Sequence, residues 1–79
     1  MDKIQILVIE EDPPIQNLIA VVLKSEGYRH HIAQTGQEGV TAAATCHPDI
    51  ILLDPDLPDM DGIDVIRRIR SWSGVPILV

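Results

Sequence analysis

The segment IILLDPDLPDMDG, residues 50–62, decides the fold of this chain. Four large apolar residues lead directly into Asp54, and a turn rich in Pro and Asp follows. A short apolar run bounded by turn residues is typical of a strand buried on both faces of a sheet. Asp54 is therefore expected at the carboxyl end of this strand, where open α/β sheets bind their ligands.

The rest of the chain alternates strands and helices around this segment. A second apolar run over residues 4–9 predicts another buried strand, and a weaker pattern over 28–33 predicts an edge strand. Helices are expected over 13–26, 35–46 and 62–71, and a fourth strand over 76–79. The apolar helix faces are expected at Ile15, Leu18, Ile19, Val22 and Leu23, then at Val40, Ala43 and Ala44, and finally at Ile63, Ile66 and Ile69.

This β-α-β-α-β-α-β order predicts an α/β fold with a doubly wound parallel sheet and right-handed crossovers. In the flavodoxin-like strand order, the first and third strands are neighbours and the crevice between them holds the ligand. We expect an incomplete version of this sheet, because only four strands are present.

Composition excludes several functions. The net charge of −6 argues against direct binding to nucleic acid or to an anionic membrane. Cys46 is the single cysteine, so an internal disulfide is impossible and a cytoplasmic location is expected. No apolar run is long enough for a signal sequence or a membrane span.

Acidic residues follow both buried strands. Glu10, Glu11 and Asp12 come after the first, and Asp54 and Asp56 come after the third. Carboxylates crowded at one sheet edge repel each other unless a cation neutralises them, and oxygen ligands suit Mg²⁺. One hypothesis is an Asp54 nucleophile that attacks phosphorus. The alternative is that these acids only cap helices and fill solvated turns.

Four segments resemble the receiver domain of two-component response regulators. They are ILVIEED at 6–12, PDIILLD at 48–54, LPDMDG at 57–62 and VPI at 75–77. The resemblance extends along all 79 residues, and WSGVP at 72–76 further resembles KdpE-like regulators of the OmpR-like group. It implies a CheY-like fold and a phosphorylated switch, rather than an enzyme, that controls an attached transcriptional output domain.

The same resemblance implies roles for the acids. Asp54 would take a phosphoryl group from a phosphohistidine of a sensor histidine kinase, with Mg²⁺ as cofactor. Glu11 falls at the main metal-binding acid, Glu10 at its companion, and the main-chain carbonyl of Asp56 at the third protein ligand. The family usually has Asp where Glu11 stands, so either the longer Glu11 reaches the metal or Asp12 substitutes for it.

Two further departures affect the phosphate site. Pro55 stands where an apolar residue with a backbone N–H is usual. The family also uses a Ser or Thr at the end of strand four and a Lys at the end of strand five, and Val79 precedes both positions. We therefore expect residues 1–79 to form a partial receiver without an output domain. Asp54 should be phosphorylated weakly or not at all, and the open fourth strand should favour a homodimer or a swapped or edge-paired oligomer.

Two other functions fit parts of the pattern. In a haloacid-dehalogenase-like phosphatase, Asp54 would be the nucleophile and Asp56 the acid/base, but that family wants Thr or Val where Pro58 stands and places its motif on the first strand. In a receiver-like binding module, the same fold would act through protein contacts without accepting phosphate.

Overall fold

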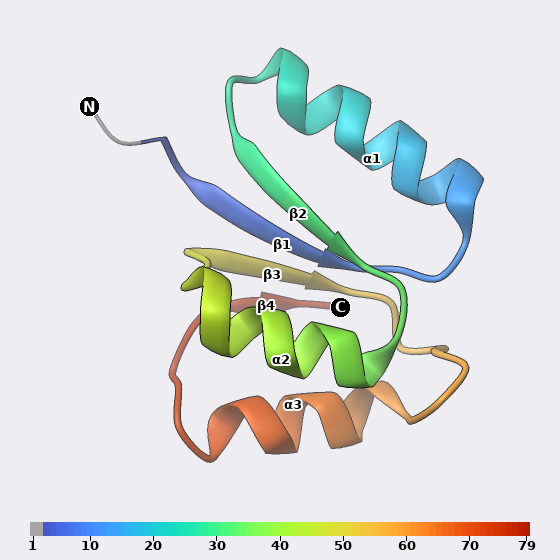
Figure 1. Ribbon diagram of the computed structural model, residues 1–79, viewed down its shortest axis with the longest axis vertical. Helices are drawn as coiled ribbons and strands as arrows, with labels where there is room; N and C mark the ends of the chain where they lie inside the picture. The colour runs from blue at the N-terminus through green and yellow to red at the C-terminus, as the bar shows by residue number, and fades with distance from the viewer. Residues whose placement is uncertain (1–2) are drawn as a thin grey trace.

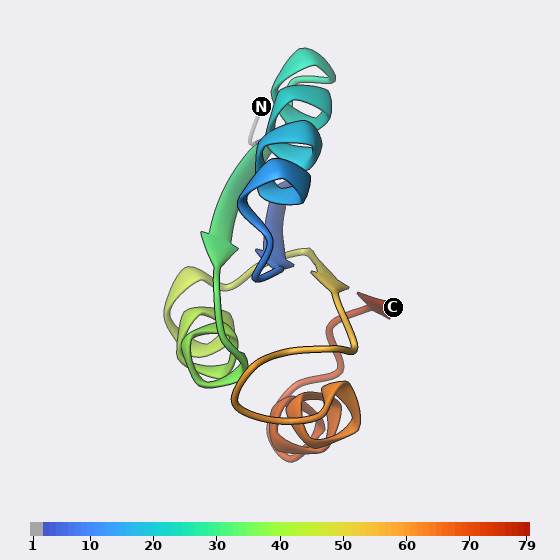
Figure 2. The same ribbon diagram turned by 90° about the vertical axis from the view of Figure 1, so that its right-hand side faces the viewer.

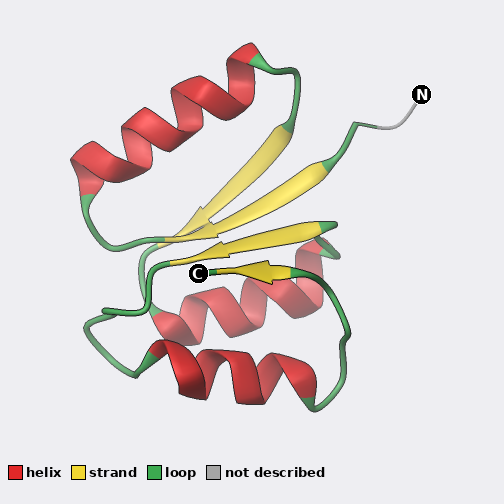
Figure 3. Cartoon of the chain, turned by 180° about the vertical axis from the view of Figure 1, so that it is seen from behind, coloured by secondary structure: helices red, strands yellow, loops and turns green. Residues whose placement is uncertain are grey.

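The computed structural model describes residues 3–79 of the chain. Its elements are β1 (Gln5–Ile9), α1 (Pro13–Ser25), β2 (Arg29–Ala33), α2 (Gly36–Cys46), β3 (Ile50–Leu53), α3 (Gly62–Arg70) and β4 (Ile77–Leu78). The strands form one parallel sheet in the order β2-β1-β3-β4, with all arrows pointing the same way (Figure 3). The predicted fold class and strand order are confirmed.

The helices lie on both faces of the sheet. Helix α1 lies on one face, and α2 and α3 lie together on the other (Figures 1 and 2). Within the sheet, Ile9 of β1 pairs with Ala33 of β2 and with Leu53 of β3. These three strands therefore end at the same level, which places the residues that follow them along one edge.

The core has two parts, one on each face of the sheet. The larger one, toward α2 and α3, contains Leu7, Ile9, Ala33, Ala42, Ala43, Ile51, Leu53, Val65 and Ile69. The smaller one, toward α1, contains Ile6, Val8 and Leu23. Strand β1 is buried on both faces as predicted. Strand β3 is fully buried only on the α2–α3 face, since Ile50 and Leu52 are half-buried. The predicted burial of β3 on both faces is therefore wrong.

The helix faces also differ from the sequence prediction. In α3 the buried residues are Val65 and Ile69, four positions apart, whereas Ile63 is 63% exposed. A helix turns by about 100° per residue, so Ile63 points about 200° away from Val65. In α2, Ala42 and Ala43 are buried and Ala44 is exposed.

Helix α1 departs furthest from the prediction. Leu23 is buried and Ile19 half-buried, but Ile15, Leu18 and Val22 are exposed. The polar side chain of Gln16 occupies the buried face beside the sheet. The apolar stripe of α1 is thus only partly used by the core in residues 3–79.

Two glycines allow close approach between elements. A Cβ on Gly39 of α2 would lie 2.5 Å from Cδ1 of Ile9, and one on Gly62 would lie 2.8 Å from Cα of Pro55. Gly39 weakens helix propensity, yet it lets α2 pack directly on β1.

Three strands are shorter than the sequence predicts. Strand β1 begins at Gln5 rather than Ile4, β2 begins at Arg29 rather than Tyr28, and β4 comprises only Ile77 and Leu78. No helix in residues 3–79 has the length and hydrophobicity needed to cross a bilayer.

Candidate functional site

The candidate site lies where β1 and β3 end side by side. The main-chain N–H of Asp54 donates to the carbonyl oxygen of Ile9 over 2.9 Å, which continues the strand pairing by one residue. Glu10 and Asp54 are the next residues on their strands. The register therefore brings these two acids to the same point of the sheet edge, as the sequence predicted.

Burial and hydrogen bonds to neighbouring residues restrain Glu10. Its side chain is 8% exposed, and its N–H donates to the carbonyl oxygen of Ala33 over 2.9 Å. Its carboxylate accepts a hydrogen bond from the N–H of Asp12 over 3.1 Å. Burial raises the pKa of Glu10, and the neighbouring Asp54 carboxylate raises it further, against a lowering by the Asp12 N–H. The pair thus carries an unfavourable concentration of negative charge.

Asp54 is half-buried and oriented by its own turn. Its Oδ1 accepts a hydrogen bond from the N–H of Asp56 over 3.0 Å, two residues further along the chain. This local bond is the usual way an Asp side chain stabilises a turn. It fixes the rotation of the carboxylate and assigns one oxygen to the turn.

The other predicted acids do not join this pair. The side chains of Glu11, Asp12 and Asp56 are exposed, and no group of three or more His, Cys, Asp or Glu in residues 3–79 lies close enough to hold a metal ion. The metal-binding roles of Glu11, Asp12 and the Asp56 carbonyl stay predictions.

The residues at this edge nevertheless fit a hard cation. Two carboxylates are adjacent, and their repulsion would be relieved by positive charge. Asp56 pairs with Asp61 in an isolated antiparallel bridge, and no donor in residues 3–79 bonds the main-chain carbonyl oxygen of Asp56. Two carboxylates and a main-chain carbonyl form an all-oxygen donor set of the kind that Mg²⁺ completes with water and phosphate oxygens.

Gln16 contributes to this site and was not predicted. Its Nε2 donates to the main-chain carbonyl of Glu10 and, over 3.5 Å, to that of Glu11. A sequence signal existed, because a Gln in the first turns of a mostly apolar helix is a candidate for a buried hydrogen bond.

A contact of Asp59 with α2 was also not predicted from the sequence. Its carboxylate accepts hydrogen bonds from the main-chain N–H groups of Gly36 and Gln37, over 2.7 and 2.9 Å. The bonds from Gln37 and Gly36 lower the pKa of Asp59. No local sequence pattern marks this contact, because 22 residues or more separate the partners.

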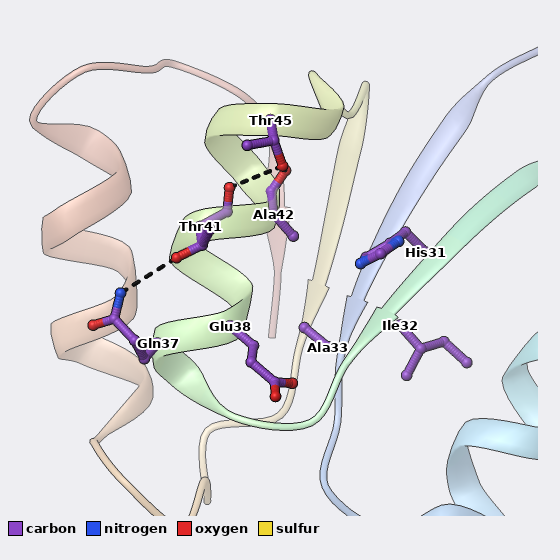
Figure 4. Close-up of a pocket in the computed structure, with 8 residues that line it drawn as sticks. All are labelled: His31, Ile32, Ala33, Gln37, Glu38, Thr41, Ala42 and Thr45. Carbon is purple, nitrogen blue, oxygen red and sulfur yellow. Dashed lines mark hydrogen bonds between the residues drawn. The ribbon is translucent and has the colours of Figure 1, made fainter.

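A groove lies apart from the carboxylates, between β2 and α2. It has a volume of about 310 Å³ and is lined by His31, Ile32, Ala33, Gln37, Glu38, Thr41, Ala42 and Thr45. Figure 4 shows His31 and Ala33 of the strand on the side of the helix residues, whereas the side chain of Ile32 points away from α2. Gln37 and Thr45 are engaged within the helix, through Oγ1 of Thr41 and the carbonyl of Thr41 respectively. The groove contains neither Glu10 nor Asp54, so the chemistry must be sought at the sheet edge.

The fold and the acidic sheet edge define a class of protein, and comparison of the sequence with known families agrees. Residues 6–79 match the family described as "Response regulator receiver domain". The chain belongs to this family, and it is a receiver domain of the two-component response regulator type. Because residues 6–79 match this family, the haloacid-dehalogenase-like phosphatase alternative is wrong.

Two curated response regulators are similar to nearly the whole of this chain. The KDP operon transcriptional regulatory protein KdpE of Escherichia coli (strain K12) is 43% identical over 74 residues, which are 94% of this chain and 33% of that protein. The DNA-binding response regulator MtrA of Mycolicibacterium smegmatis is 41% identical over 75 residues, again covering 33% of its length. This chain therefore spans about a third of the curated relatives it matches.

Among solved structures, a receiver domain with bound metal is similar. It belongs to the sensor histidine kinase PA1611 of Pseudomonas aeruginosa PAO1 and has a magnesium ion coordinated in its active site cleft. It superposes with a TM-score of 0.90 at 35% identity and covers 96% of this chain and 65% of its own.

Proposed function

We propose that Asp54 of this receiver domain is the phospho-acceptor of a two-component switch. The observation that carries the proposal is the buried Glu10 carboxylate beside Asp54 at the shared end of β1 and β3. Burying one carboxylate against another is unfavourable without a cation, so folding stability alone gives no reason to keep the pair.

In this proposal, the Asp54 carboxylate is the nucleophile. Its Oδ1 accepts the Asp56 N–H, which leaves Oδ2 to attack the phosphorus of a phosphohistidine. The new bond joins Oδ2 to phosphorus as the nitrogen–phosphorus bond breaks, and the imidazole nitrogen takes the electron pair. The resulting acyl phosphate stays on the protein until water removes it.

The metal in this proposal is Mg²⁺, held by Glu10, Asp54 and the main-chain carbonyl of Asp56, with Glu11 or Asp12 as the further acid. When bound, it supplies positive charge that screens Asp54 from the incoming phosphoryl oxygens. The magnesium ion of the PA1611 receiver domain supports this choice. The exposed Glu11 has to turn toward Glu10 to take part.

The family assignment supports a proposal for the partner and the cellular setting. We infer a sensor histidine kinase as phosphoryl donor, a cytoplasmic location, and control of transcription through a separate output domain, as the names of KdpE and MtrA suggest for those proteins. The segment itself carries a net charge of −6, which supports an indirect role in DNA binding. We also infer self-association through exposed apolar residues of the sheet edge.

The test uses a small-molecule phosphoryl donor and mass spectrometry. Two proteins are treated with acetyl phosphate and Mg²⁺: residues 1–79 alone, and a chimera in which these residues are followed by the remainder of the KdpE receiver domain. We expect labelling of the chimera and little labelling of the shorter chain, because the Ser/Thr and Lys that the family uses come from the added segment.

Matched variants identify the acceptor. Asp54→Asn in the chimera should abolish the acid-labile phosphate, whereas Asp61→Asn, in the same loop, should leave it. A chimera that folds and binds Mg²⁺ but takes no phosphate would instead favour the receiver-like binding module.

A further inference from the structure

We propose that Gln16 is a positioning residue for the metal-binding acids. It fixes the main chain of Glu10 and Glu11, the segment from which the metal-binding acids after β1 extend. The inference rests on the proposed function, since it concerns the Mg²⁺ site at Asp54, but the observations that carry it come from α1.

Gln16 is a buried polar side chain on a helix that exposes several of its apolar residues. It is 8% exposed, whereas Leu18 on the same helix is 65% exposed. A Leu or Met at position 16 would bury apolar surface without the cost of desolvating an amide. Helices usually bury apolar side chains and expose polar ones. The reverse arrangement at Gln16 indicates that the hydrogen bonds of its amide group are needed.

The amide acts on two consecutive carbonyl oxygens. Nε2 of Gln16 donates to the carbonyl of Glu10 and, more weakly at 3.5 Å, to that of Glu11. Because both partners only accept hydrogen bonds, the NH₂ end of the amide must face them. One side chain therefore holds two successive peptide groups with their oxygens toward α1.

This contact completes the restraint of Glu10. Its N–H is bonded to Ala33 on β2, its carbonyl to Gln16 on α1, and its carboxylate to the N–H of Asp12. In residues 3–79, Gln16 is the side chain that ties α1 to the carboxyl end of β1. Without it, the peptide between Glu10 and Glu11 could rotate, and the main-chain positions from which the two side chains extend would no longer be fixed.

The experiment measures cation binding rather than phosphorylation. Mg²⁺ is titrated into residues 1–79 by calorimetry, and Mn²⁺ binding by electron paramagnetic resonance serves as a second readout. Gln16→Met keeps the length and volume of the side chain and removes the amide. Asn17→Leu, at the exposed neighbouring position, is the matched control.

We expect Gln16→Met to raise the Kd for Mg²⁺ about tenfold, as is typical when a residue supporting metal ligands is lost. Asn17→Leu should bind as the parent chain does. Gln16→Asn provides a second variant if the Met variant fails to fold; its amide is one methylene too short to reach both carbonyls, and it should also raise the Kd.

The outcomes separate this inference from the proposed function. If the parent chain binds Mg²⁺ and a folded Gln16→Met variant binds it equally well, Gln16 has only a structural role and the inference fails alone. If the parent chain binds neither Mg²⁺ nor Mn²⁺, the metal site fails and the inference falls with it. Circular dichroism melts in EDTA establish that each variant is folded, and a purely structural role would lower the Tm without moving the Kd.

Discussion

The carboxylate of Asp59 lies 2.7 Å from the main-chain nitrogen of Gly36, the first residue of α2. Its second oxygen accepts the N–H of Gln37, and Thr35 accepts that of Glu38, so three N–H groups at the start of α2 are bonded. Asp59 belongs to the loop that begins at Asp54. The loop that carries the candidate phospho-acceptor is therefore attached to the start of a helix 22 residues or more away in sequence.

Asp59→Asn should weaken this attachment. The amide can accept only one of the two bonds and lacks the charge that favours a helix N-terminus. We expect a Tm lower by about 5 °C at pH 7, measured by circular dichroism. Asp61→Asn is the control, since Asp61 precedes α3 without a side-chain capping bond. Equal effects of the two substitutions would show that the bonds to α2 do not matter.

The Asp59 effect should depend on pH. Hydrogen bonds from Gln37 and Gly36 lower the pKa of Asp59 below its ordinary value of 3.8. A lowered carboxyl pKa contributes stability that is fully present above pH 3.8 and is lost as the pH falls through the folded-state pKa. The Tm difference between the parent chain and Asp59→Asn should therefore hold from pH 7 to pH 5 and shrink below pH 3.8. A difference that persists unchanged at the lowest pH would refute a charge-dependent contact.

Glu10→Gln should stabilise the metal-free protein. Burial and then the neighbouring Asp54 raise the pKa of Glu10 above its ordinary value of 4.5. A raised carboxyl pKa means that stability falls as the pH rises from 4.5 through the folded-state pKa, and the penalty is complete above it. In EDTA at pH 7 the variant should melt a few degrees higher than the parent chain, and the two should converge below pH 4.5.

The same substitution should weaken Mg²⁺ binding, because a carboxamide is a poorer ligand than a carboxylate. Adding saturating Mg²⁺ should then raise the Tm of the parent chain and leave that of Glu10→Gln nearly unchanged. A Glu10→Gln variant that is less stable than its parent in EDTA would show that the Glu10–Asp54 pair is not under electrostatic strain.

Gly62→Ala should destabilise the fold and disturb the site. The added Cβ would lie 2.8 Å from Cα of Pro55, the residue after Asp54, so backbone must move. We expect a loss of about 1–3 kcal/mol in the free energy of unfolding by urea denaturation. Gly74→Ala is the matched control, because nothing lies within 4 Å of its Cβ position. That variant should be neutral or slightly more stable.

The fold could be predicted from the sequence because apolar runs and turn residues carry it. Strands β1 and β3, the parallel order and the meeting of Glu10 with Asp54 all follow from local patterns and one topological rule. The helix faces could not be predicted equally well. Gln16 is buried because its amide bonds two main-chain carbonyls that are in reach only in the folded chain. Asp59 contacts α2 through a hydrogen bond between residues distant in sequence.

Helix α3 shows why the spacing of apolar residues alone does not identify the buried face of a helix. Ile63, Ile66 and Ile69 share a three-residue spacing, but the rotation of the helix is set by the fit of Val65 and Ile69 against the sheet. Ile69→Ala should therefore cost about 2–5 kcal/mol in unfolding free energy, while Ile63→Ala should stay within about 0.5 kcal/mol. Urea denaturation of the two variants checks this, and equal losses would mean that both residues are buried in solution.

Residues 1–79 produced alone are expected to self-associate at the β4 end of the sheet. In residues 3–79, β4 is the last strand of the order β2-β1-β3-β4, and Leu78 on it is 59% exposed. An uncovered strand edge with apolar side chains favours pairing with a second chain, and a charged residue there opposes it. Light scattering should show a mass above that of the monomer, increasing with concentration. Leu78→Lys should restore the monomer, whereas Leu18→Lys, at an equally exposed position on α1, should not. A monomer across a wide concentration range would exclude self-association. Dissociation by Leu18→Lys alone would place the contact elsewhere than at β4.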